Sequence, residues 1–132
     1  MTAMKTVDIG RLGERQAVRF LRKQGCRILE RNLHVSHNEI DIIAKDRKSR
    51  TLVFVEVKTR SVDSDLYSPF GTPASSVTKQ KQKRTLDAAR GYIASNKRLC
   101  ELNVRFDVIE VYLNKESSKV IKINHIENAF GV

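Results

Sequence analysis

Asp41, Glu56 and Lys58 lie in two apolar segments rich in valine and isoleucine, residues 38–45 and 51–59. A short charged connector separates the segments, and this pattern predicts a β-hairpin. Side chains alternate between the two faces of a strand, so Glu56 and Lys58 share a face. A register that pairs the segments closely around the connector places Asp41 opposite Glu56, with β-carbons roughly 5 Å apart. The three side chains would therefore meet on one face of the hairpin.

Two carboxylates held this close repel one another unless a proton or a cation lies between them. Lys58 supplies part of that positive charge, and a divalent metal ion would supply more. Hard oxygen ligands suit Mg²⁺ or Mn²⁺, so Asp41 and Glu56 are the predicted metal ligands. The alternative is a weak ion pair on a solvated strand face, where Glu and Lys two residues apart are common. The apolar sequence around Glu56, the matching aspartate and the basic chain favour the metal site.

The spacing of Asp41 and the Glu56-Val57-Lys58 triplet resembles the catalytic signature of the PD-(D/E)xK nuclease superfamily. The flanking sequence resembles the YraN-like family of small bacterial restriction-endonuclease-like proteins, which are related to Holliday-junction resolvases. The matching motifs run in order along nearly the whole chain: Gly13-Glu14, Glu39-Ile40-Asp41, Phe54-Val55-Glu56-Val57-Lys58-Thr59-Arg60, Phe70-Gly71, Arg105-Phe106-Asp107 and Asn128-Ala129-Phe130. Asn38 departs from the glycine expected before Glu39, a mild change because Asn also tolerates a left-handed turn.

The resemblance implies a restriction-endonuclease-like α/β/α sandwich in a single nuclease-like domain over residues 1–132. It implies metal-dependent cleavage of phosphodiester bonds in duplex or branched DNA, in repair or recombination. The implied catalytic residues are Glu14, Asp41, Glu56 and Lys58, with Glu14 as an acid on the first helix. A bound metal ion would activate water and stabilise charge on the phosphodiester, and Lys58 would orient that water or neutralise the transition state. The resolvase relatives also imply a homodimer, and the need for a protein partner stays open.

Composition narrows the choice of partner. The chain has 132 residues, 40% hydrophobic and 30% charged, which fits one soluble globular domain. Its 25 Lys and Arg against 15 Asp and Glu give a formal net charge of +10, which predicts a polyanionic partner, most simply nucleic acid. The sequence has no long apolar run and no signal-peptide core, so we expect a cytoplasmic protein without membrane contact. Cys26 and Cys100 are isolated, which excludes a disulfide framework and a zinc site.

The hydrophobic pattern predicts the order helix, three strands, helix, two strands, and hence an α/β fold with a mixed five-stranded sheet. We expect helices at residues 8–24 and 78–95, and strands at residues 26–33, 38–45, 51–59, 104–113 and 120–126. Asp8 and Thr78 are the predicted N-caps. The crossover helix should make the fourth strand parallel to the third. Residues 61–76, rich in Ser and punctuated by Pro and Gly, predict a loop, either a binding element or a connector.

The second predicted helix begins with four cations, Lys79, Lys81, Lys83 and Arg84. Cations near a helix N-terminus are unfavourable for the helix dipole, and a docked polyanion would offset that effect. Together with Arg60 they are the predicted nucleic-acid-binding residues, contacting backbone phosphates. An ordinary solvated helix face is the alternative. The sequence has no aromatic-rich platform for single strands, which favours duplex or branched DNA.

Two other classes of function stay open on the sequence alone. A non-catalytic nucleic-acid-binding module would keep the nuclease fold and bind without metal, independently of Glu56 and Lys58. A protein-interaction adaptor would show no nucleic-acid affinity at physiological salt. Binding through several phosphates would instead weaken steeply with salt, with a log–log slope of about −0.9 for each phosphate contact on duplex DNA.

Overall fold

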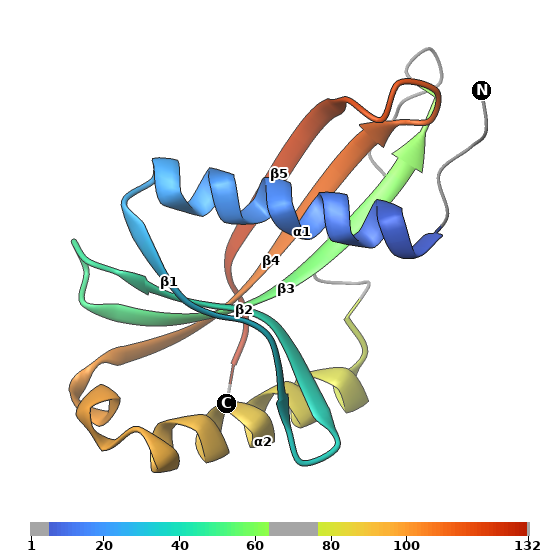
Figure 1. Cartoon of the computed structure of the whole chain (residues 1–132). Helices are drawn as coiled ribbons and strands as arrows, with labels where there is room; N and C mark the ends of the chain where they lie inside the picture. The colour runs from blue at the N-terminus through green and yellow to red at the C-terminus, as the bar shows by residue number, and fades with distance from the viewer. Residues whose placement is uncertain (1–5, 64–76, 132) are drawn as a thin grey trace.

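The computed structural model describes residues 6–63 and 77–131 (Figure 1). The elements in chain order are α1 (Thr6–Lys23), β1 (Cys26–Val35), β2 (Asn38–Asp46), β3 (Thr51–Val62), α2 (Lys79–Ser95), the short 3-10 helix η3 (Lys97–Glu101), β4 (Asn103–Asn114) and β5 (Val120–Phe130). This order confirms the predicted α/β class with a mixed five-stranded sheet. The short helix η3 was not predicted from the sequence.

The sheet has the strand order β1-β2-β3-β4-β5. β3 and β4 are parallel, as the crossover helix predicted, and the other neighbouring strands are antiparallel. In the β2–β3 hairpin, the paired residues run from Asp46 opposite Thr51 to Ile42 opposite Val55, which is the predicted register. Asp41 and Glu56 therefore follow directly after the last paired residues, at the point where the two strands separate.

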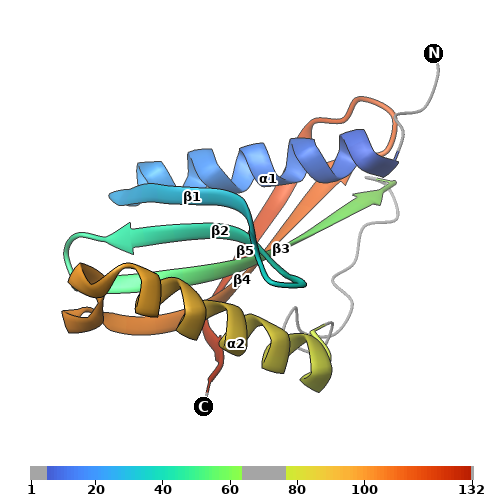
Figure 2. The ribbon, with the colours of Figure 1, turned by 60° about the horizontal axis from the view of Figure 1, so that its bottom comes forward.

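One helix covers each face of the sheet, with α1 on one side and α2 on the other (Figure 2). The core beneath α1 consists of Ala17, Val18, Leu21, Ile42, Ala44, Val53, Val55, Ile109, Val111 and Leu113. The core beneath α2 consists of Ile40, Ile43, Leu52, Phe54, Ala88, Ala89 and Phe106. Alternation along β3 thus puts Val53 and Val55 beneath α1 and Phe54 beneath α2, so Glu56 and Lys58 continue the α2-side face.

Several predicted boundaries need correction. The first helix begins at Thr6, so Asp8 lies in its first turn and is not the N-cap, although an acid there still suits the helix dipole. Thr78 is confirmed as a cap, since its hydroxyl accepts a hydrogen bond from the Lys81 N–H at 3.1 Å. β3 continues through Val62, because its last residues still pair with β4. The rest of the predicted loop, with the Phe70-Gly71 motif, lies outside the described residues.

Two further expectations concern cysteines and membrane contact. Cys26 and Cys100 are free thiols, and the sequence predicted no disulfide framework. Among the described residues, neither long helix is apolar enough to cross a bilayer.

Candidate active site

Asp41 lies where β2 leaves β3, and its side chain bridges the two strands. Its Oδ2 accepts a hydrogen bond from the Val57 backbone N–H at 2.8 Å. This side-chain bond takes over from the backbone pairing that ends at Val55. Glu56, the residue before Val57, is 8% exposed, which is unusual for a glutamate. The strand separation therefore holds two carboxylates together at the edge of the core.

Both carboxylates line a cavity of about 350 Å³ between the two helices. Its wall is formed by residues from α1, β2, β3 and α2: Ile9, Gly10, Glu14, Glu39, Asp41, Glu56, Val57, Thr59 and Lys81. The structure thus brings together the predicted residues Glu14, Asp41 and Glu56, which are far apart in the sequence. Glu39 also lines the cavity and was not predicted as a site residue, although it belongs to the motif that contains Asp41.

Gly13 determines how closely α1 approaches this cavity. A β-carbon at position 13 would lie 1.8 Å from the Thr59 side-chain oxygen, so any larger residue would push the helix away from β3. The close approach places the next residue, Glu14, at the cavity wall. The sequence contains this glycine in the Gly13-Glu14 motif, but residue spacing does not identify Thr59 as the residue that it approaches.

The environment of Asp41 disfavours its charged form. Burial, followed by repulsion from Glu56, raises the pKa of Asp41 to about 7. Glu14 adds to the increase, whereas the Val57 N–H and Lys81 oppose it. Asp41 therefore exchanges its proton near neutral pH, and an added cation would displace that proton.

Two lysines flank Glu56 at distances typical of weak ion pairs. Lys58 Nζ lies 3.7 Å from one carboxylate oxygen, and Lys81 Nζ lies 3.9 Å from the other. Both lysine side chains are about one-third exposed, at 33% and 34%. Pairs this long and this exposed contribute little to stability and are easily exchanged for another ligand.

The structure separates the predicted phosphate-binding cations of α2. Lys81 faces the cavity, whereas the other three, Lys79, Lys83 and Arg84, are exposed on the helix. The exposed cations are placed to meet a polyanion from outside, and their role in binding stays a prediction.

The donor set suits a hard divalent cation with a partly aqueous shell. Among the described residues, no three His, Cys, Asp or Glu side chains come together closely enough to hold a metal ion. Mg²⁺ commonly binds through one or two carboxylates and keeps several waters, so the Asp41 and Glu56 pair fits that mode.

Residues 13–111 match the model of a family described as "Uncharacterised protein family UPF0102". The chain belongs to the UPF0102 family. This membership confirms the predicted YraN-like resemblance. Full-length relatives support it. The UPF0102 protein TTE1452 of Caldanaerobacter subterraneus is 43% identical over 130 residues, covering 96% of this chain and 100% of the relative. A UPF0102 protein of Alkaliphilus oremlandii is 47% identical over 124 residues, covering 92% of this chain and 97% of the relative.

One solved structure also resembles this UPF0102 member weakly. It is the structure of Pyrococcus furiosus SfsA in complex with Ca²⁺, with 14% sequence identity and a TM-score of 0.30. The match covers 92% of this chain and 62% of that chain. A likeness at this level carries no argument about fold or function, so placement in the PD-(D/E)xK superfamily stays a prediction.

In this UPF0102 member the predicted phosphate-binding residue Arg60 contacts Glu110, a carboxylate that was not predicted as a site residue. Arg60 Nε donates to Glu110 Oε2 at 2.6 Å, and the pKa of Arg60 is raised by that hydrogen bond. Glu110 is 1% exposed and also accepts a hydrogen bond from the Tyr112 hydroxyl. A glutamate within the apolar strand at residues 108–112 repeats the signal that identified Glu56.

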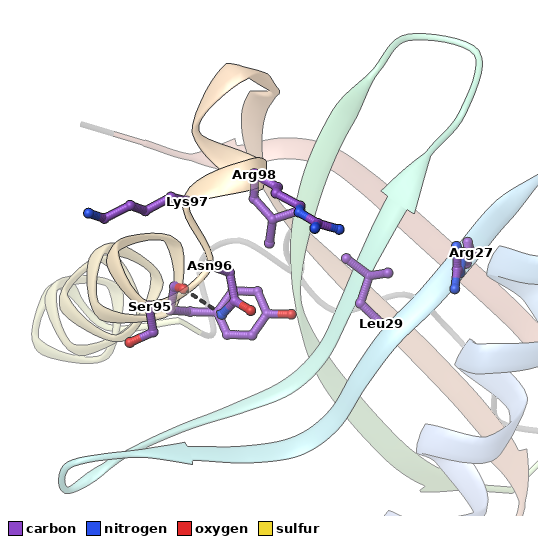
Figure 3. A pocket seen from close by; sticks show the side chains of 8 residues that line it. Arg27, Leu29, Ser95, Asn96, Lys97 and Arg98 are labelled. Atoms are coloured by element: carbon purple, nitrogen blue, oxygen red, sulfur yellow. Dashed lines mark hydrogen bonds between the residues drawn. The ribbon is translucent and has the colours of Figure 1, made fainter.

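A larger cavity, of about 660 Å³, lies between β1 and the end of α2 (Figure 3). Its described lining contains cations and no carboxylate: Arg27, Leu29, Tyr92, Ser95, Asn96, Lys97, Arg98 and Leu99. Figure 3 shows Lys97 and Arg27 at opposite ends of this cavity, so the cations do not converge on one point. The smaller cavity with the paired carboxylates is therefore the candidate active site.

Proposed function

We propose that this UPF0102 member is a Mg²⁺- or Mn²⁺-dependent endonuclease that cleaves phosphodiester bonds of duplex or branched DNA. The observation that carries the proposal is the placement of Asp41 and Glu56 in one cavity, where the pKa of Asp41 is raised to about 7. Such a strongly perturbed carboxyl beside a second acid is typical of functional sites. The formal net charge of +10 supports a polyanionic substrate.

Asp41 and Glu56 would hold the metal ion, with Glu14 at the cavity wall to position it through water. When bound, the ion would activate a water molecule and stabilise negative charge on the phosphate. The Val57 N–H fixes the orientation of the Asp41 carboxylate, at 2.8 Å from Oδ2. Asp41 would give up its proton on cation binding, because a positive charge there would offset both its burial and the charge of Glu56.

The lysines act on the substrate. Lys58 and Lys81 make only long ion pairs with Glu56, at 3.7 and 3.9 Å, so they would be available for phosphate oxygens if Glu56 held a cation. Lys58 shares the face of Glu56, so it would orient the attacking water or neutralise charge in the transition state. Arg60 and the exposed cations of α2, Lys79, Lys83 and Arg84, would bind backbone phosphates and set position rather than sequence. A homodimer would supply two sites for cutting both strands.

The test is cleavage of labelled single-stranded, duplex, flap and four-way-junction DNA in Mg²⁺ or Mn²⁺. Asp41→Asn and Glu56→Gln should each lower the rate about 100-fold or more, because the metal contributes several kcal/mol to transition-state stabilisation. Glu116→Gln, at an exposed position in the β4–β5 turn, is the matched control and should cleave like the wild type. Omission of the metal should abolish cleavage by all active forms.

The outcomes separate the alternatives. Cleavage that persists in Asp41→Asn and Glu56→Gln would contradict the site assignment. Metal-independent binding without cleavage, unchanged in both variants, would favour the non-catalytic module. The absence of nucleic-acid binding at physiological salt would leave the protein-interaction adaptor.

A further inference from the structure

Glu110 is a buried carboxylate on the same sheet face as the candidate active site. It lies beside Lys58 in the parallel register of β3 and β4, and Arg60 lies beside Tyr112. Phe54 and Phe106 begin the same alternation, and both belong to the core beneath α2. Glu110 therefore occupies the α2-side face, next to the lysine that the proposed mechanism uses.

Both oxygens of Glu110 are engaged. Oε2 accepts from Arg60 Nε at 2.6 Å, and Oε1 accepts from the Tyr112 hydroxyl. The Glu110 side chain is 1% exposed, whereas that of Arg60 is 38% exposed. A buried ion pair of this kind is a weak source of stability, since well-packed apolar residues often serve as well. The Arg60–Glu110 pair instead holds the guanidinium of Arg60 in one orientation at the protein surface.

The placement of Arg60 suits the phosphate next to the reacting one. Arg60 is two residues beyond Lys58 on the same face of β3, a separation of roughly 7 Å along a strand. Figure 1 shows this end of β3 extending away from α2. A guanidinium binds phosphate with two parallel hydrogen bonds, and prior orientation lowers the entropy lost on binding.

A second buried pair, Arg105 with Asp107, has a different arrangement. Arg105 contacts Asp107 through both Nε and Nη2, at 2.9 and 3.0 Å, and its side chain is 17% exposed. Arg105 makes two parallel hydrogen bonds inside the protein, whereas Arg60 contacts Glu110 through Nε, interacts with Tyr112 and keeps more of its side chain exposed. The contrast favours an external ligand for Arg60.

We propose that Arg60 binds the phosphate adjoining the scissile one on the substrate strand, and that Glu110, with Tyr112, is the positioning residue that orients it. This inference rests on the proposed function and makes it more specific. The substrate strand must continue past the cleaved bond on the Arg60 side, so internal bonds are preferred to terminal ones.

The experiment measures equilibrium binding of a labelled duplex across a salt series, with cleavage kinetics in Mg²⁺ on the same variants. Arg60→Gln should weaken binding about tenfold or more, as expected for a lost charge-assisted contact. It should also reduce the magnitude of the log–log salt slope by about 0.9, corresponding to one phosphate. Arg60→Lys should restore the slope but not the affinity, because an ammonium ion lacks the planar fork.

Glu110→Gln should weaken binding in the same direction, and the double variant should bind no worse than Arg60→Gln alone, since Glu110 acts through Arg60. In cleavage, these variants should raise KM while kcat changes little. Asp107→Asn is the matched control: it removes the other arginine-paired buried carboxylate and should leave the salt slope unchanged. Thermal melting identifies the folded fraction of each variant.

Each outcome decides the inference. Suppose that the wild type binds and cleaves DNA, and that the Arg60 and Glu110 variants have the same affinity and salt slope. This outcome would overturn the role of Arg60 and Glu110 and leave the proposed function intact. Additive losses in the double variant would overturn the positioning role of Glu110. If a single variant fails to fold, the Arg60→Gln and Glu110→Gln double variant is used, because it leaves no unpaired buried charge. Its log–log salt slope should still be smaller by about 0.9, and an unchanged slope would overturn the inference. Failure of the wild type to bind DNA would overturn both proposals.

Discussion

Asp107 and Asp41 both lie on strands of the sheet, the first fully buried and the second half-buried, and their carboxylates have opposite electrostatic environments. Asp107 is 0% exposed and accepts hydrogen bonds from Arg105 and from the Asn128 N–H at 2.9 Å, and it pairs with His125 Nε2 at 2.6 Å. Burial alone would raise the pKa of Asp107, but the His125, Arg105 and Asn128 hydrogen bonds outweigh it and lower that pKa. The hydrogen-bond partners of Asp107 therefore favour its charged form despite its burial.

Among the described residues, Asp41 accepts a hydrogen bond from the Val57 N–H, and it faces a second carboxylate, Glu56, in place of an arginine. Burial and Glu56 raise its pKa to about 7. The comparison shows how one sheet uses the same residue type in two ways. We therefore expect Asp107 to stabilise the fold and Asp41 to destabilise it at neutral pH, where its negative charge beside Glu56 could be neutralised by a cation.

The largest expected difference between the two sites is in stability. Asp107→Asn should lower the free energy of unfolding by about 3 kcal/mol at pH 7, because Arg105 and His125 lose their buried partner. The folded-state pKa of Asp107 is lower than its ordinary value of 3.8, so its contribution is present above pH 4 and is lost as the pH falls further. Urea unfolding at pH 7 and pH 3 measures both effects.

The control for this prediction is Asp87→Asn, at an exposed position on α2. It should change the free energy of unfolding by less than about 0.5 kcal/mol. An Asp107→Asn variant as stable as this control at pH 7 would remove Asp107 from its structural role and break the comparison.

Asp41→Asn should instead raise the free energy of unfolding at high pH. The folded-state pKa of about 7 exceeds the ordinary value of 3.8, so the unfolded chain loses this proton first. Wild-type stability therefore falls as the pH rises from about 4 to 7 and is constant, with respect to this group, above that. Asn cannot ionise and still accepts from Val57, so we expect a gain of about 1–3 kcal/mol at pH 8 in EDTA.

Urea unfolding at pH 8 and pH 4 checks this prediction, since the gain should fade towards pH 4. Asp107→Asn serves as the control because it should be destabilised at pH 8. Destabilisation of Asp41→Asn at pH 8 would contradict this prediction, since it would mean that the ionised Asp41 carboxylate stabilises the folded protein.

The sequence was sufficient for the part of the site that lies in the hairpin. A connector of a few residues and a strong apolar alternation allow one register, so Asp41 and Glu56 could be placed together. Glu110 and Arg60 lie on parallel strands joined through a long crossover, and no short turn fixes their register. Their pairing could therefore not be read from residue spacing.

The helix contacts show a similar limit. Glycine at position 13 predicts a close approach, but the sequence cannot say that Thr59 is the residue approached. The short helix η3 was missed because five residues are too few to show a helical period. The order of the larger elements, in contrast, follows from hydrophobic periodicity that extends over many residues.

The smallest expected effect tests directly whether a cation neutralises the excess negative charge of Asp41 and Glu56. At pH 8, Mg²⁺ or Mn²⁺ at ten times its dissociation constant should stabilise the wild type by about 1.4 kcal/mol, because the ion binds the folded chain. Thermal melting with and without metal, at matched ionic strength, measures this shift. Asp107→Asn should keep it, whereas Asp41→Asn and Glu56→Gln should lose it. The shift should shrink below pH 7, since a proton on Asp41 competes with the cation. An equal shift in Asp41→Asn would place the cation elsewhere and contradict the assignment of Asp41 as a metal ligand.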